Sequence, residues 1–220
     1  MKLAQLVSVA AVLVGLAPLK PLSAQSTSVA EPGDIVRVDG AVTLDGHDFD
    51  ASVAPTFMKD NSVLRTADGR AEVLLSKGVA LRLGQQSSFR MIRRRLGDVR
   101  VEMLGGTAFV IAAAVPKEHS VTIACEDAIT PSDAGVYRFD AYPAWAAGDG
   151  HCRLKVYKGS ADVRLATLNV LVKSGQTRNM QSECGDHIPT FPFKIDDADA
   201  LNESTGAFRS GWVPENRANR

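Results

Sequence analysis

Residues Val63 to Met91 read VLRTADGRAEVLLSKGVALRLGQQSSFRM, and this stretch decides the fold class. Side chains alternate between the two faces of a β-strand, so each apolar run beside Lys77-Gly78 presents one apolar face. The residues on these faces are Ala71, Val73 and Leu75, then Val79, Leu81 and Leu83. Because glycine takes the positive φ of a tight turn, the stretch predicts a β-hairpin whose apolar face fills a core. Any functional surface should then lie on its polar face or at the neighbouring edge from Arg93 to Arg95.

Similar short runs recur from Asp34 to about Met180, separated by glycine-bearing turns. None of them sustains a 3.6-residue period, and several alternate apolar with charged residues, as in residues 98–103. Gly105-Gly106 is interpreted as one of the turns between strands, because it lacks phosphate-loop spacing. The pattern predicts a mainly β fold, an antiparallel β sandwich or jelly-roll-like roll with one solvated face on its strands.

The pattern changes after Pro192. Leu201, Phe208 and Trp212 are spaced by seven and four residues, which places them on one face of a helix. We therefore expect residues 182–213 to form a loop and a short C-terminal helix packed on the β domain, and residues 214–220 to form a flexible tail.

The N-terminal residues 1–24 combine Lys2, a long apolar stretch and a small residue at Ala24, the pattern of a cleavable signal peptide. A retained membrane anchor is the alternative, since the stretch approaches the length that spans a bilayer. A linker over 25–33 and a β domain over 34–181 would follow, in a periplasmic or secreted protein. Without residues 1–24 the chain has 23 basic and 25 acidic residues, a balance that argues against nucleic acid as a partner.

The three cysteines are Cys125, Cys152 and Cys184. Thiols of exported proteins tend to pair, and Cys125 and Cys152 each share a strand face with apolar residues. This favours a Cys125–Cys152 disulfide with Cys184 left free or joined elsewhere, although spacing alone leaves the connectivity open.

The basic residues Arg90, Arg93, Arg94 and Arg95 form the run RMIRRR and are a candidate interaction edge. They could bind a polyanion or anionic lipid. The alternative is a solvated strand edge whose charges discourage unwanted pairing.

Other polar clusters lack the spacing that their chemistry requires. Residues 45–50 read DGHDFD, but they lack the glycine and the glutamate of a calcium loop. Cys184 and His187, with His151-Cys152, are a poor match to a zinc site, because neighbouring strand residues point to opposite faces. No nucleophile motif is present in the sequence. We therefore predict no enzyme activity, no cofactor and no metal.

Six segments in order carry a family resemblance: GDIVRVDGAVTL, VLRTADGRAEVLLSKGVALRLGQQSSF, LGGTAFVI, GVYRFDA, LKVYKGSADV and VLVKSGQTRNM. From about Gly33 to Met180 the chain resembles the FecR-like domain, the periplasmic module of iron-dicitrate-type sensor and anti-sigma regulator proteins. The resemblance implies an all-β, jelly-roll-like module that acts by contacting protein partners and has no catalytic residues. The predicted signal peptide stands where the full-length regulators carry a cytoplasmic domain, which implies a stand-alone exported module.

The sequence thus predicts an exported, non-enzymatic protein-binding or signalling module of the cell envelope, with no integral membrane span after signal cleavage. An envelope structural or assembly protein is the first alternative. A β domain that binds a small ligand such as a carbohydrate is the second, on fold analogy.

Overall fold

The computed structural model describes residues 31–50, 57–115, 120–142, 151–165, 168–180 and 190–192. The predicted signal peptide, most of the linker, Cys184, His187, the C-terminal helix and the tail lie outside these residues. Strands dominate the described part, which confirms the predicted mainly β fold. In this part of the chain no helix is long and apolar enough to cross a bilayer.

The strands are β1 (Ile35–Asp39), β2 (Val42–Leu44), β3 (His47–Asp48), β4 (Val63–Thr66), β5 (Arg70–Ser76), β6 (Val79–Leu83), β7 (Ser88–Arg95), β8 (Asp98–Ala112), β9 (Ser120–Cys125), β10 (Asp127–Pro131), β11 (Gly135–Tyr142), β12 (His151–Lys158), β13 (Ser160–Arg164), β14 (Asn169–Lys173), β15 (Gln176–Met180) and β16 (Phe191–Pro192).

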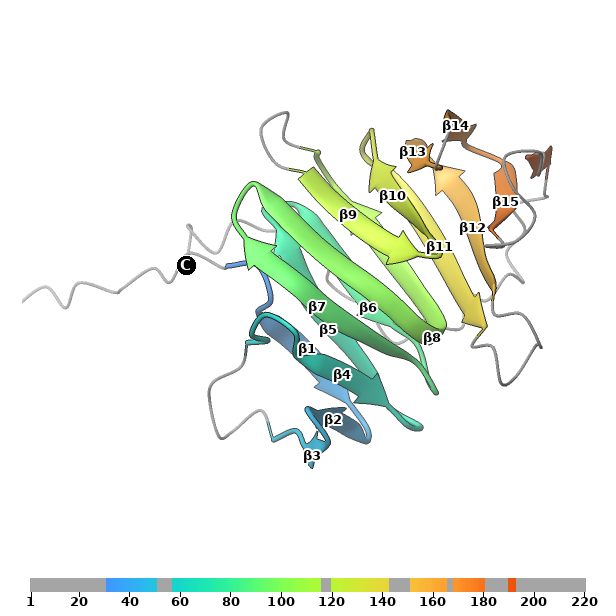
Figure 1. Cartoon of the computed structure of the whole chain (residues 1–220). Helices are drawn as coiled ribbons and strands as arrows, with labels where there is room; N and C mark the ends of the chain where they lie inside the picture. The colour runs from blue at the N-terminus through green and yellow to red at the C-terminus, as the bar shows by residue number, and fades with distance from the viewer. Residues whose placement is uncertain are drawn as a thin grey trace, which may run out of the picture.

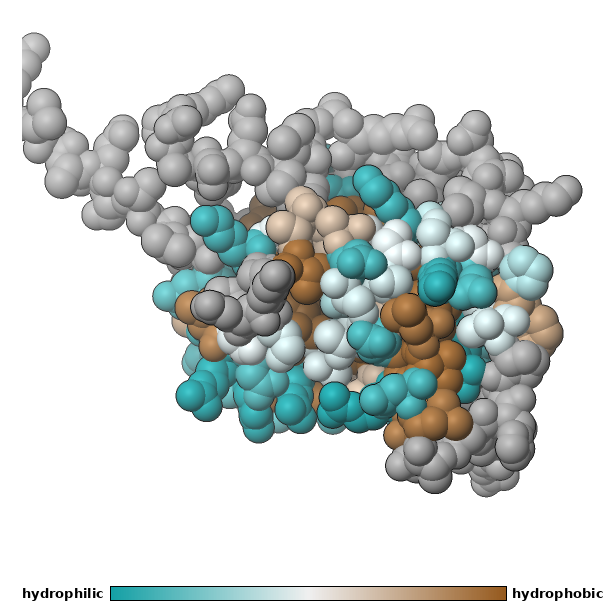
Figure 2. Space-filling model, turned by 90° about the horizontal axis from the view of Figure 1, so that it is seen from above, coloured by the Kyte–Doolittle hydropathy of each residue, from teal (hydrophilic) through white to brown (hydrophobic). Residues whose placement is uncertain are grey.

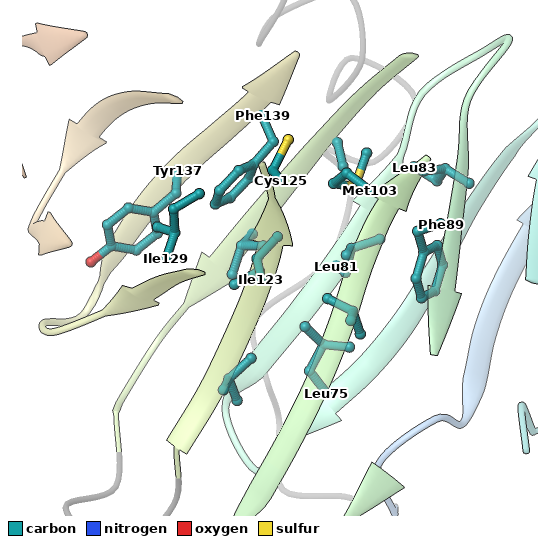
Figure 3. Close-up of a cluster of buried hydrophobic side chains, with 14 of the residues drawn as sticks. Leu75, Leu81, Leu83, Phe89, Met103, Ile123, Cys125, Ile129, Tyr137 and Phe139 are labelled. Carbon is teal, nitrogen blue, oxygen red and sulfur yellow. The ribbon is translucent and has the colours of Figure 1, made fainter. Parts of the chain in front are cut away.

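They form two packed layers that share one strand (Figure 1). The first sheet has the order β1-β5-β6-β8-β11-β12-β15-β16, and the second has the order β3-β2-β4-β7-β8-β9-β10-β13-β14. The buried apolar residues lie between them, as Figure 3 shows for Leu75, Leu81, Phe89, Ile123 and Phe139. This arrangement is a β sandwich.

The shared strand, β8, bends at Gly106. Its residues up to Gly105 pair with β7 in the second sheet, and those from Gly106 onward pair with β11 in the first. Gly106 has a φ of +80°, which permits the bend without ending the strand. The sequence interpretation of Gly105-Gly106 as a turn between two strands is therefore wrong, because a single 15-residue strand passes through this point.

One pairing departs from the antiparallel expectation. β8 and β9 run parallel, with Asp98 beside Ser120. Because β8 bends from one sheet into the other, residues 113–119 suffice to connect its end to a strand that starts beside its own first residue.

The hairpin predicted from residues 63–91 is confirmed in β5 and β6. Gly78 has a φ of +85° in the turn, and the six predicted apolar side chains are at most 1% exposed. The opposite face is also buried, with Glu72 at 2% and Arg82 at 7% exposure. The expectation that this polar face is an exposed functional surface is wrong, because the two side chains form an ion pair of 2.9 Å that allows both to leave water.

Candidate functional site

Cys125 and Cys152 are joined by a disulfide, with their Cα atoms 5.7 Å apart. Cys125 ends β9 in the second sheet, and Cys152 lies in β12 in the first. The bond therefore ties the two sheets together inside the core and leaves neither cysteine available as a metal ligand.

Three of the four arginines of the candidate interaction edge form ion pairs. Arg90 contacts Glu102 at 3.0 Å, and Arg93 contacts Asp98 at 2.5 Å. Asp98 also accepts a hydrogen bond from Arg100, and the bonds from Arg100 and Arg93 hold the pKa of its carboxyl below its usual value.

Arg94 fastens the end of β7 to the segments beside it. Its guanidinium contacts Glu31 at 2.9 Å and the Pro32 carbonyl at 3.0 Å, and lies 4.7 Å from the centre of the Phe57 ring. Its backbone N–H donates to Asp60 at 2.8 Å. Acidic neighbours thus offset much of the charge of the cluster, so binding of polyanions through these arginines stays a prediction.

The acidic segment at residues 45–50 has a structural role at Asp45. The Asp45 carboxylate accepts the Val63 backbone N–H at 2.8 Å and the Ser62 hydroxyl at 2.9 Å, which ties the β2–β3 turn to β4. Throughout the described residues no group of three His, Cys, Asp or Glu side chains could hold a metal ion.

A pocket of about 420 Å³ opens at the bend of β8, and sequence reasoning missed it. Its lining comes from four separate segments: Arg65 and Thr66, Gln86 to Ser88, Leu104 to Thr107, and Asp140 to Tyr142. Because these segments are far apart in the sequence, no local motif could have indicated the pocket.

Asp140 forms the buried polar wall of this pocket and is 2% exposed. One carboxylate oxygen accepts the Thr107 hydroxyl at 2.9 Å and Arg138 Nε at 2.8 Å, and the other accepts an Arg153 nitrogen at 2.9 Å. Burial lowers the pKa of Arg138, but the Asp140 charge outweighs it and raises that pKa above its ordinary value. The network fixes the end of β11 against β12.

Polar groups at the mouth of the pocket could contact a small polar molecule. Arg153 also donates to the Tyr142 hydroxyl at 3.0 Å, and the Tyr142 ring is 38% exposed. Gln86 has a φ of +49°, which is rare for a residue with a side chain and directs the β6–β7 turn over the pocket. Hydroxyl, amide and aromatic groups of this kind are typical of sites that bind polar small molecules.

Among the described residues, the outer edge of β14 is not paired with another strand. The Lys173 N–H points away from β13 and donates a hydrogen bond to the side-chain oxygen of Gln176 at 2.8 Å. Backbone groups alternate along a strand, so Leu171 directs its own N–H and C=O the same way. No described strand pairs with this edge, and the Leu171 side chain is 46% exposed. Figure 2 views the molecule from the top of Figure 1, the side on which β13 and β14 lie, and shows a compact column of hydrophobic atoms there.

Two solved structures are similar to part of this chain. A crystal structure described as a "putative anti-sigma factor" from Parabacteroides distasonis, at 2.50 Å resolution, has a TM-score of 0.50 and 15% sequence identity. The match covers 62% of this chain and 62% of that one. A second structure with the same description, at 1.65 Å, has a TM-score of 0.49 and 14% identity over 65% of this chain and 62% of its own.

This chain matches less than two thirds of those chains. At 15% identity, the likeness to the first structure shows the fold alone. No family model matches the chain, and no curated protein matches its sequence.

Proposed function

We propose that the chain is a FecR-like, exported, non-enzymatic module that acts in regulation by binding a protein partner in the cell envelope. The observation that carries the proposal is the shared fold with the Parabacteroides structure of TM-score 0.50, which is described as an anti-sigma factor. The order of the strand-turn motifs from Gly33 to Met180 points the same way.

The outer edge of β14 is the proposed contact surface. An unpaired strand edge can add a strand of a partner through main-chain hydrogen bonds, and an exposed apolar side chain beside it adds contact area. Leu171 supplies both features, whereas the ion pairs at the end of β7 leave less free charge for a partner there.

Regulation is tested by deleting the gene and comparing transcripts in strains that carry the wild-type gene, no gene, or Leu171→Lys. A regulatory module predicts that a small, defined set of transcripts changes in the deletion strain and stays changed with Leu171→Lys. Unchanged transcripts together with a defect in envelope integrity would instead support a structural role.

Export is tested by fractionation of the wild-type strain. If the protein is exported, it should be found in the periplasm or the medium.

The pocket at the bend of β8 supports a second candidate, the binding of a small polar ligand such as a saccharide. Its polar lining and the exposed ring of Tyr142 are the observations that favour this candidate. A thermal-shift screen of glycans on the wild-type protein and on Tyr142→Ala tests it. This candidate function requires a ligand that raises the melting temperature of the wild-type protein but not that of Tyr142→Ala. A screen that finds no such ligand would exclude this candidate function.

A further inference from the structure

The middle of the outer face of the first sheet, opposite the core, is shielded from water. Phe109 is 1% exposed and Tyr157 is 6% exposed, yet neither belongs to the core cluster between the sheets. Their ring centres are 6.3 Å apart, and the Arg138 guanidinium lies 5.7 Å from the centre of the Phe109 ring. With the buried Glu72–Arg82 ion pair, these residues form a second buried layer.

All the described strands belong to the two sheets, so none of them covers this face. An antiparallel sheet with water on one side would expose most side chains of that side. Burial of large aromatic and charged side chains here therefore requires a further covering segment.

The face is positively charged along a row that crosses six strands. In register across β1, β5, β6, β8, β11 and β12 stand Arg37, Glu72, Arg82, Phe109, Arg138 and Lys155. Glu72 and Asp140, which pairs with Arg138 at 2.8 Å, supply two anions beside these four cations, so the row keeps a net positive charge around an aromatic centre. A cover that is both acidic and apolar would complement it.

We propose that residues 193–213 of this chain cover this face, with their apolar side chains over Phe109 and Tyr157. The segment has four acidic and two basic residues, and the apolar residues Leu201, Phe208 and Trp212 at helical spacing. It follows β16, the last strand of the same sheet, so it starts at the edge of the face that it would cover.

The length of the segment matches the width of the face. Six strand spacings separate β16 from β5, about 29 Å at the usual spacing. A helix over residues 193–213 would be about 32 Å long. The internal stretches between described strands, such as residues 143–150 and 181–189, are much shorter and are tied to strands at both ends.

The two tryptophans, Trp145 and Trp212, provide the test in the full-length chain. In a Trp145→Phe protein, Trp212 is the sole tryptophan, and acrylamide quenching of its fluorescence reports its exposure. The proposal predicts quenching several-fold weaker than in the urea-unfolded chain, rising at least twofold in Phe109→Ala and in Lys155→Glu. Two substitutions on the second sheet are matched controls, Ile92→Ala and Arg100→Glu, and should leave the quenching unchanged.

The second outer-face variant keeps the test valid if Phe109→Ala fails to fold, which circular dichroism would show. Trp212 that is quenched as freely as in urea would overturn the proposal. So would shielding of Trp212 that neither outer-face variant changes. In the reciprocal Trp212→Phe protein, a response of Trp145 to Lys155→Glu would assign the cover to residues 143–150 and would also overturn the proposal. None of these outcomes depends on the proposed regulatory function.

Discussion

Gly106 is the residue on which the shared strand depends. A Cβ atom at this position would stand 2.5 Å from the Gln86 carbonyl oxygen and 2.6 Å from Ser87 Cα, in addition to the strain of a φ of +80°. Backbone atoms cannot move aside without distorting the turn that they belong to. We therefore expect Gly106→Ala to lower the free energy of unfolding by about 3 kcal/mol.

Gly46 provides the matched control, because it has a similar φ of +81° but open space around a Cβ. Gly46→Ala should cost only the conformational strain, about 1 kcal/mol. Urea unfolding of both variants measures the difference. Equal losses would show that the bend of β8 does not require the space at Gly106.

Tyr137 gives the stability of the fold a dependence on alkaline pH. Its ring is fully buried, and its hydroxyl donates to the Asp133 carbonyl at 2.6 Å and lies 2.9 Å from the Ser160 carbonyl. Burial raises its pKa to about 12. Since an unfolded tyrosine titrates near pH 10, the neutral hydroxyl stabilises the fold fully below pH 10, and that contribution is lost as the pH rises towards 12.

The contribution amounts to at most about 3 kcal/mol for a pKa raised from 10 to about 12. Unfolding in urea at pH 9 and at pH 11.5 should therefore show a larger fall for the wild type than for Tyr137→Phe, although the variant is less stable at pH 9. A fall of the same size in both proteins would contradict the role of Tyr137.

Among the elements, β9 and β12 are joined across the sandwich by the Cys125–Cys152 disulfide, which spans 27 residues of sequence. A bond closing a loop of this length stabilises a fold by about 3 to 4 kcal/mol in the chain-entropy account. We expect the double substitution of both cysteines by serine to lower stability by about that amount.

The same bond fixes the thiol count. Alkylation of the unfolded, unreduced protein should add one label, at Cys184, and prior reduction should raise the number to three. Three labels without reductant would show that the two sheets are not linked covalently in the isolated protein.

The backbone groups of the edge strand β14 form two rows, one that points towards β13 and one that points away from it. Proline at Leu171 removes an N–H that points away from β13, whereas proline at Val170 removes one that points towards it. We expect Leu171→Pro to keep nearly wild-type stability and Val170→Pro to lose about 2 to 3 kcal/mol in urea unfolding. The reverse order would show that the free edge has been assigned to the wrong residues.

At the scale of the whole molecule, the local patterns of the sequence predicted the local structure well. Period-two alternation gave the apolar faces of β5 and β6, because that signal depends only on neighbouring residues. The pairing of Cys125 with Cys152, favoured from their apolar strand faces, is also the pairing that the structure contains.

Features that depend on distant segments could not be predicted. The continuation of β8 through Gly106 and the burial of Glu72 both require knowledge of which strands pair. The pocket at the bend combines residues as far apart as Arg65 and Tyr142, and the sequence of neither region indicates the other. The sequence therefore predicted the fold class, but it did not predict the surfaces on which the function is proposed.

The central claim is that the β14 edge binds a protein partner, and cross-linking in the native cells tests it most directly. A photoreactive amino acid is placed at Leu171 or, as a control, at Ile92, which is a similarly apolar and exposed side chain on β7. The account predicts a discrete protein adduct from position 171 that is absent from position 92 and is lost with Asn169→Pro, which alters the same edge. No adduct at position 171, or the same adducts from both positions, would contradict it.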